Sequence, residues 1–210
     1  MKHFTKLAFA LLLAVPAFCD NIPGIPYSTG VLDDGTLAPQ GTVDLHYVDV
    51  TSGTPQPVYI ESRGFNYYGT AQPDGPAANG NGTGSFIYQT TFTLTGYDPS
   101  TVTLAGFWAS DDGSSQMTLN GNTLSVSNVG CCGTVDFTID SGFVNGLNTL
   151  DFYWSNYSDP GDLGVGFTSF TGTPLPADAA APEPATLALF GVSGVGLLLA
   201  SRLRRRVTQS

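Results

Sequence analysis

The chain has 210 residues with a formal net charge of -10 at pH 7, and charged side chains make up 11% of it. From Leu7 to Ser201 it holds one basic residue, Arg63, against all 17 carboxylates. Because nucleic-acid binding draws mainly on Lys and Arg, this balance excludes a nucleic-acid partner, and the length suits one globular domain between processed ends.

The N-terminus predicts a secretory signal peptide over residues 1–19. Lys2 and Lys6 come before an apolar run, Leu7 to Val15, and small residues follow up to Cys19. A membrane-spanning helix needs roughly 20 apolar residues, and this run is shorter. We therefore expect a signal helix at this end and an exported protein.

Residues 20–172 predict an all-β ectodomain, an antiparallel β-sandwich. Most aromatic and apolar side chains of Ser85–Leu94 fall on one parity, which is the pattern of a half-buried strand. The same alternation recurs in residues 101–108, 135–140 and 149–154. Asn120-Gly121 separates two strand-like runs and favours a tight hairpin turn, because both residue types readily adopt positive φ angles.

Two stretches predict loops without regular structure. Residues 70–84 are polar and glycine-rich, and residues 173–181 contain Pro174, Pro176 and several alanines. The first stretch is expected to be a long surface loop. The second is expected to be a linker that keeps the C-terminal tail clear of the sandwich.

Aspartates in predicted turns are the candidate metal ligands. Asp33, Asp111 and Asp112 lie on loops, where carboxylate and carbonyl oxygens converge as Ca²⁺ requires, although no EF-hand spacing is present. Calcium is the one cofactor that the sequence suggests. Two carboxylates across a cleft are also the machinery of a glycosidase, so an extracellular glycan hydrolase is an alternative function.

Tyrosines beside predicted loops are the candidate ligand-binding residues. Tyr67, Tyr68 and Tyr157 border loops, where an aromatic ring can stack on the apolar face of a sugar ring. Trp108 and Trp154 lie on the apolar parity of their strands, so we expect them in the core.

The remaining polar residues favour binding over catalysis. Thr91, Thr93 and Thr95 form a row of hydroxyls on one strand face, which makes an ice-binding protein a further alternative, although threonine is also a good strand former. His46 is the only histidine after the signal peptide, and catalysis by Ser or Cys needs a histidine base. Because His46 lies in a strand-like run, we expect it to pack or to form a hydrogen bond, and we expect no enzyme.

The C-terminus combines three features in a fixed order. Pro182-Glu183-Pro184 comes first, and the uncharged apolar run Ala185 to Ser201 follows. As a helix this run spans roughly 25 Å, which predicts a single transmembrane helix slightly shorter than a bilayer core. An arginine cluster closes the chain and would keep this end in the cytoplasm and the domain outside: Arg202, Arg204, Arg205 and Arg206.

This arrangement, residues 182–206, resembles a PEP-CTERM sorting signal, the tail of exported proteins in bacteria that make exopolysaccharide. The resemblance implies that an exosortase, a membrane peptidase, recognises Pro182, Glu183 and Pro184 and cuts nearby. The protein would be anchored in the membrane before processing and would then pass to the cell envelope or the extracellular matrix. The same tail type also occurs on proteins described as ice-binding.

The ectodomain resembles galactose-binding-like jelly-roll domains found on such proteins. The resemblance rests on the order of five segments, Tyr27–Val31, Asp33–Tyr47, Tyr88–Gly113, Leu119–Asn122 and Ser141–Phe152. It implies that carbohydrate is held in loops at one end of the sandwich, often with a structural calcium nearby. We therefore predict a non-enzymatic surface or matrix protein that associates with carbohydrate or extracellular polysaccharide.

Overall fold

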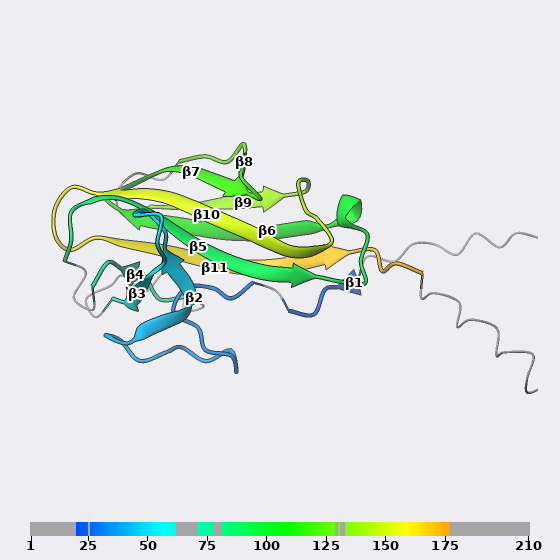
Figure 1. The fold of residues 1–210 in the computed structure, drawn as a ribbon, viewed down its shortest axis with the longest axis horizontal. Coiled ribbons are helices and arrows are strands. Elements are labelled where there is room, and N and C mark those ends of the chain that lie inside the picture. Colours follow the sequence, from blue (N-terminus) through cyan, green and yellow to red (C-terminus); the bar gives the residue numbers. More distant parts are fainter. Residues whose placement is uncertain are drawn as a thin grey trace, which may run out of the picture. The chain divides into compact units, whose positions relative to one another are not determined.

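Almost all regular structure in the described part of the chain is β-strand (Figure 1). The computed structural model describes residues 20–24, 26–61, 71–77, 81–128, 130 and 133–176. Its elements are β1 (Asp20–Asn21), β2 (Val43–Asp49), β3 (Gln56–Ile60), β4 (Asp74–Gly75), β5 (Gly84–Leu94), the 3-10 helix η1 (Pro99–Thr101), β6 (Thr103–Asp111), β7 (Gly113–Leu119), β8 (Asn122–Thr123), β9 (Thr134–Ile139), β10 (Gly146–Asn156) and β11 (Asp162–Gly172). The all-β prediction is confirmed.

The helices predicted at the two ends, within residues 1–19 and 182–206, lie outside the described residues. Within the ranges given above, no helix has the length and apolarity needed to cross a membrane. The chain divides into two compact units, Met1–Pro174 and Leu175–Ser210, and every strand among the described residues belongs to the first.

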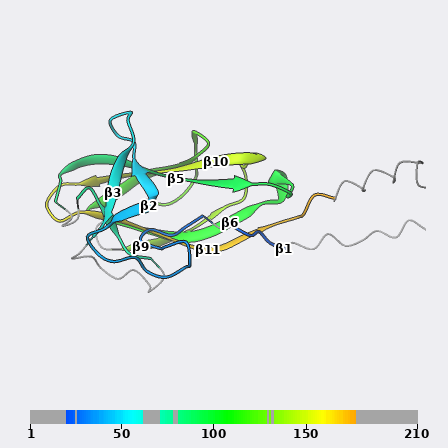
Figure 2. The ribbon, with the colours of Figure 1, turned by 60° about the horizontal axis from the view of Figure 1, so that its bottom comes forward.

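The strands form one hydrogen-bonded path that folds into two layers. Its order is β8-β7-β10-β5-β2-β3-β4-β11-β6-β9, with β1 attached to β11, and every ladder is antiparallel. Figure 2 shows β5 and β10 in one layer and β6, β9 and β11 in the other. The path passes from one layer to the other through β2, β3 and β4. The predicted antiparallel sandwich is therefore confirmed.

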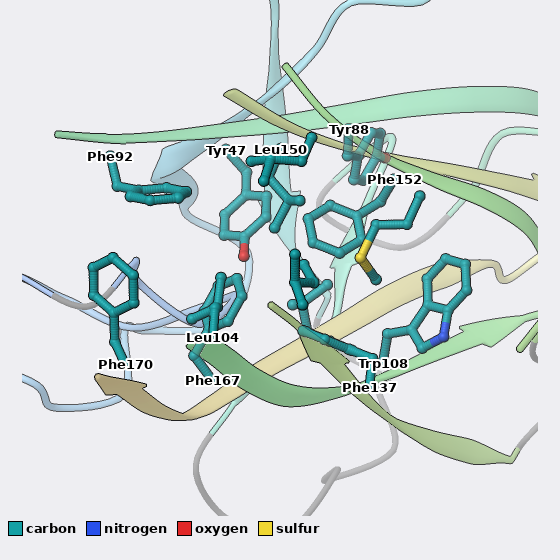
Figure 3. Packing of buried hydrophobic residues seen from close by; sticks show 14 of the residues in the cluster. Tyr47, Tyr88, Phe92, Leu104, Trp108, Phe137, Leu150, Phe152, Phe167 and Phe170 are labelled. Carbon is teal, nitrogen blue, oxygen red and sulfur yellow. The ribbon is translucent and has the colours of Figure 1, made fainter. Parts of the chain in front are cut away.

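The core between the layers contains the apolar parity predicted from the sequence (Figure 3). Its buried side chains include Tyr88, Phe92 and Leu94 of β5, Leu104 and Trp108 of β6, Phe137 and Ile139 of β9, and Leu150, Phe152 and Trp154 of β10. Full burial of one such side chain contributes about 1.5–3 kcal/mol, so this core is the main source of stability.

β6 is buried on both faces, which the alternation did not predict. Because successive side chains of a strand point to opposite faces, Phe107 and Ala109 turn away from Trp108, and they form a second cluster with Ala71. Residues 71–75 are all buried and include β4, so the prediction of a continuous polar loop over residues 70–84 is wrong there. A Cβ atom on Gly166 would lie 2.2 Å from the Phe107 ring, so this position requires glycine.

The chain enters and leaves the sandwich at the same end. Asp20 of β1 pairs with Gly172, the last residue of β11. The N-terminal segment then follows β11, since the Ile22 amide donates to the Phe170 carbonyl at 2.8 Å and the Thr29 amide donates to the Val165 carbonyl at 2.9 Å. The opposite end carries the β4–β5, β6–β7 and β10–β11 connections.

The predicted Asn120-Gly121 hairpin joins β7 to β8. The φ angles of its two residues are 52° and 78°, as a tight hairpin turn requires. The Asn120 side-chain amide donates to Oδ1 of the buried Asn148 at 2.9 Å, and the Val144 amide donates to the same oxygen at 2.9 Å. Asn148 therefore ties this hairpin to the β9–β10 connection.

Candidate functional site

Three connections are hydrogen-bonded to one another at the end of the sandwich remote from Gly172. We call this region the loop end; it consists of Gly82 before β5, Asp111–Gly113 between β6 and β7, and Tyr157–Gly161 between β10 and β11. The Gly82 amide donates to Asp159 Oδ1 at 2.7 Å, and Asn156 Nδ2 donates to the Gly82 carbonyl at 2.8 Å. These two bonds hold together segments that are 77 and 74 residues apart in the sequence.

Asp112 fixes the backbone that carries Tyr157. Its Oδ2 atom accepts hydrogen bonds from the Tyr157 amide at 2.6 Å and from the Ser158 amide at 3.2 Å. The amide of Asp112 donates to the Ser155 carbonyl at 3.1 Å. The Tyr157 side chain is nevertheless 78% exposed, so the loop end presents a predicted sugar-stacking ring from a backbone that is held in place.

Asp111, beside Asp112, is a half-buried carboxyl at the start of this region. Burial raises the pKa of Asp111, and the charge of Asp112 and a hydrogen bond with it raise that pKa further. A carboxyl that keeps its proton to higher pH can donate a hydrogen bond to a ligand. Asp111 can therefore donate a hydrogen bond to a ligand at the loop end, whereas Asp112 holds the backbone of Tyr157 and Ser158.

The structure does not bring the three predicted calcium ligands into one group. Asp33 lies before β2, and its Oδ1 atom is 3.3 Å from Nε2 of His46. Across the described ranges, no three His, Cys, Asp or Glu side chains gather closely enough to hold a metal ion. Calcium at Asp33, Asp111 and Asp112 stays a prediction.

His46 packs and forms a polar contact, as predicted. Its ring stacks on Tyr27 with centroids 3.7 Å apart and planes 7° apart. The remaining predicted residues lie outside the described part of the chain; they are Tyr67, Tyr68, Pro182, Glu183, Pro184, Arg202, Arg204, Arg205 and Arg206.

The threonine row of β5 is exposed but is only partly continued on β10. Thr91 and Thr93 are exposed, and their cross-strand neighbours on β10 are Thr149 and Leu147. Leu147 is 63% exposed, so an apolar side chain interrupts the hydroxyl array. Ice binding stays a prediction.

A pair of buried carboxyls, Asp44 and Asp74, was missed in the sequence. Asp44 of β2 is 4% exposed, and its two oxygens accept hydrogen bonds from the Gly30 amide at 2.6 Å and from the His46 amide at 2.7 Å. Asp74 of β4 is fully buried, and neither of its oxygens has a hydrogen-bond donor in the described structure. A single Asp in a stretch rich in Pro and Gly is typical of a turn, so no local signal indicated its burial.

Burial is the main cause that raises the pKa of Asp74, followed by the charge of Asp44. The charge of Asp162 raises the pKa of Asp74 further. Asp74 therefore keeps its proton to a higher pH than an exposed carboxyl does.

Comparison with protein-family models matches the PEP-CTERM protein-sorting motif to residues 180–206. This range contains the predicted Pro-Glu-Pro sequence and the arginine cluster. PEP-CTERM signals are processed by exosortases, so the chain carries the signal of an exported protein that is sorted to the cell envelope or the extracellular space. The match covers the tail and leaves the sandwich unassigned.

No curated protein matches the sequence. Among solved structures, the chain is similar to the isomalto-dextranase of Arthrobacter globiformis T6 in complex with panose, with 12% sequence identity and a TM-score of 0.30. The similarity covers 72% of this chain and 32% of that chain, so this chain spans about a third of that protein. At this TM-score the similarity supports no conclusion about fold or function.

Proposed function

We propose that the protein is a non-enzymatic component of the bacterial cell surface or exopolysaccharide matrix, and that it binds carbohydrate at the loop end. The supporting observation is the Tyr157 ring, which is 78% exposed while Asp112 holds its backbone. Because the backbone that carries the ring is already ordered, stacking of Tyr157 on a sugar costs less conformational entropy than it would on a free loop.

The neighbouring carboxyls suit the polar edge of the same ligand. Asp111 borders the β6–β7 connection and Asp159 follows Tyr157 in the β10–β11 connection. Carboxyl oxygens accept hydrogen bonds from sugar hydroxyls, whereas the tyrosine ring covers the apolar face of a pyranose. The proposal includes the finer assignment of the sandwich as a galactose-binding-like jelly roll, with ligand in loops at one end.

The proposed route to this location passes through the membrane. Residues 185–201 would span the bilayer with the arginine cluster in the cytoplasm until the exosortase cuts near Pro182. The chain leaves β11 at Gly172, at the end opposite the loop end.

Replacing Tyr157 with alanine is expected to weaken polysaccharide binding about tenfold, or 1.4 kcal/mol, because the stacking surface is lost. The measurement is a titration of the full chain in mild detergent against a panel of extracellular polysaccharides. Leu147→Ala is the matched control, since Leu147 is also exposed but lies at the other end of β10. If Tyr157→Ala and the parent chain bind the polysaccharide with equal affinity, the loop-end site is contradicted. If the parent chain binds no polysaccharide of the panel, carbohydrate binding itself is contradicted.

A glycan hydrolase is the second candidate, and the environment of Asp111 favours it. A carboxyl with a raised pKa is what a general acid requires. Release of reducing sugar by the full chain, lost in Asp111→Asn, would establish hydrolysis in place of simple binding. An assay of ice-recrystallisation inhibition distinguishes ice binding from carbohydrate binding and from glycan hydrolysis.

A further inference from the structure

The outward face of the layer that contains β7, β10 and β5 is polar but almost uncharged. These strands lie side by side (Figure 1). In all three, which the structure describes throughout, Asp151 of β10 is the single Asp, Glu, Lys, Arg or His. Because alternate residues of a strand face the same side, Thr149, Asp151, Tyr153 and Ser155 form the outward row of β10, and all four are half-buried. A single carboxylate therefore stands among neutral side chains.

The carboxylate of Asp151 is held in place by the two strands beside it. Asp151 is directly opposite Gln89 of β5 and Thr118 of β7. Gln89 Nε2 donates to Oδ1 at 2.8 Å, and Thr118 Oγ1 donates to Oδ2 at 3.1 Å. An ionised carboxylate offers roughly four acceptor positions, so these two bonds leave acceptor capacity for a ligand. The group is thus oriented before any ligand arrives, which lowers the entropic cost of binding.

Tyr153 is the next residue on this row. Its cross-strand neighbours are Ile87 of β5 and Gln116 of β7. The Gln116 side chain is itself oriented, because its Nε2 atom donates to Thr123 Oγ1 at 3.2 Å. The half-buried Tyr153 side chain therefore offers aromatic surface beside an ordered amide and two residues from the Asp151 carboxylate.

The row continues to the loop end. Ser155 Oγ lies 3.1 Å from Ser85 Oγ, and the Ser155 carbonyl accepts from the amide of Asp112, the residue that holds Tyr157. Tyr157 has the parity of Tyr153 and Ser155 and follows the end of β10 directly. At roughly 3.3 Å per residue, the row from Asp151 to Tyr157 is about 20 Å long. The outward face of β10 and the loop end thus form one continuous surface.

We propose that this row, from Tyr157 to Asp151, binds an internal stretch of an extended, uncharged polysaccharide. The inference rests on the carbohydrate site proposed at the loop end, and it adds the ligand class and the direction in which the ligand lies. Tyr157 and Tyr153 would cover the apolar faces of sugar rings, while Asp151 accepts hydrogen bonds from sugar hydroxyls. A row of this length spans several sugar units, so it takes the interior of a chain and not only a terminal sugar.

The charges favour an uncharged ligand. β5, β7 and β10 hold no Lys or Arg, and the chain has a formal net charge of -10. A polysaccharide that carries carboxylates or sulfates would be repelled by this charge and would meet Asp151 on the face itself. Hydroxyl groups, by contrast, match the hydroxyls and amides of the row, which can both donate and accept.

The test is isothermal titration calorimetry of the full chain in mild detergent. The probes are mannan, galactan and β-glucan, which are uncharged, and alginate, which is acidic, followed by the disaccharide and the hexasaccharide of each uncharged polymer. We expect at least one uncharged polymer to bind and alginate not to bind. The hexasaccharide is expected to bind about tenfold more tightly than the disaccharide, because it reaches from Tyr157 to Asp151.

Two substitutions separate the row from the loop end. Tyr153→Ala and Asp151→Asn are each expected to weaken hexasaccharide binding about tenfold and to leave disaccharide binding at Tyr157 unchanged. The unchanged disaccharide affinity shows that each variant is folded. The matched controls are Tyr59→Ala, which removes a half-buried ring on β3, and Asp136→Asn, which changes an exposed carboxylate on β9 in the other layer (Figure 2). Both are expected to bind the hexasaccharide as the parent chain does.

The possible failures are distinguishable. If Tyr157→Ala weakens binding but Tyr153→Ala and Asp151→Asn do not, the ligand stays at the loop end, and the extended row is overturned while the proposed function stands. Equal affinities for disaccharide and hexasaccharide would overturn the extended row in the same way. Tighter binding of alginate than of the uncharged polymers would overturn the ligand class. If no probe binds the parent chain, both the row and the carbohydrate site at the loop end are overturned.

Discussion

Replacement of Trp108 with alanine is expected to lower the free energy of unfolding by about 3–5 kcal/mol, the largest effect of any substitution considered for this chain. Trp108 is fully buried in β6, and its ring centroid lies 6.2 Å from that of Phe152 on β10. Its indole Nε1 donates to the Ser127 carbonyl at 3.1 Å, so the substitution removes a hydrogen bond as well as a large apolar volume. The cavity would open between the two layers, where the strands cannot close around it.

Urea unfolding of the full chain, followed by far-ultraviolet circular dichroism, measures this loss. Leu147→Ala is the control, because truncation of a largely exposed leucine is expected to change stability by less than about 0.5 kcal/mol. A loss below about 1 kcal/mol for Trp108→Ala would contradict the placement of this ring in the core.

Asp74→Asn is expected to stabilise the protein by about 1–3 kcal/mol at pH 8, because a neutral amide replaces a buried acid whose oxygens have no hydrogen-bond partner in the described structure. The pKa of Asp74 is raised in the folded protein, chiefly by burial, so the folded state binds its proton more tightly than the unfolded state does. The stability associated with this proton is complete below pH 4 and is lost as pH rises through the folded pKa. The parent chain should therefore weaken with rising pH, and Asp74→Asn should not show this component of the loss.

Urea midpoints, measured from pH 4 to pH 8 for the parent chain and for Asp74→Asn, test this expectation. Asp136→Asn serves as the control, because an exposed carboxylate changes little in its surroundings on unfolding. Parallel pH profiles for the parent chain and Asp74→Asn would show that the Asp74 carboxyl is not the source of the pH dependence.

The measurements on Asp74 and Tyr157 concern different parts of the molecule. Asp74 lies on β4, between β3 and β11, and Tyr157 lies at the loop end. Loss of polysaccharide binding in Tyr157→Ala with an unchanged urea midpoint would assign the two residues to separate tasks. A polysaccharide affinity that depends on Asp74 would show that β4 and the loop end are coupled.

Local sequence determined several of the strands, the hairpin turn and the sorting tail. The parity of Tyr88, Phe92 and Leu94 was sufficient to predict a half-buried β5, because side chains of a strand alternate between its two faces. Asn120-Gly121 was sufficient for its turn, because the requirement for positive φ belongs to these two residues alone. The tail motif is a continuous segment whose meaning does not depend on the fold.

Only the tertiary structure decided which distant residues became neighbours. Asp74 was expected in a polar loop, yet pairing with Ile60 and Leu163 places it in the interior. Asp112 was expected to be a metal ligand, and its contacts with the Tyr157 and Ser158 amides join segments 45 and 46 residues apart. Burial and electrostatic environment are set by the elements that surround a residue, and those elements come from parts of the chain that a local pattern cannot connect.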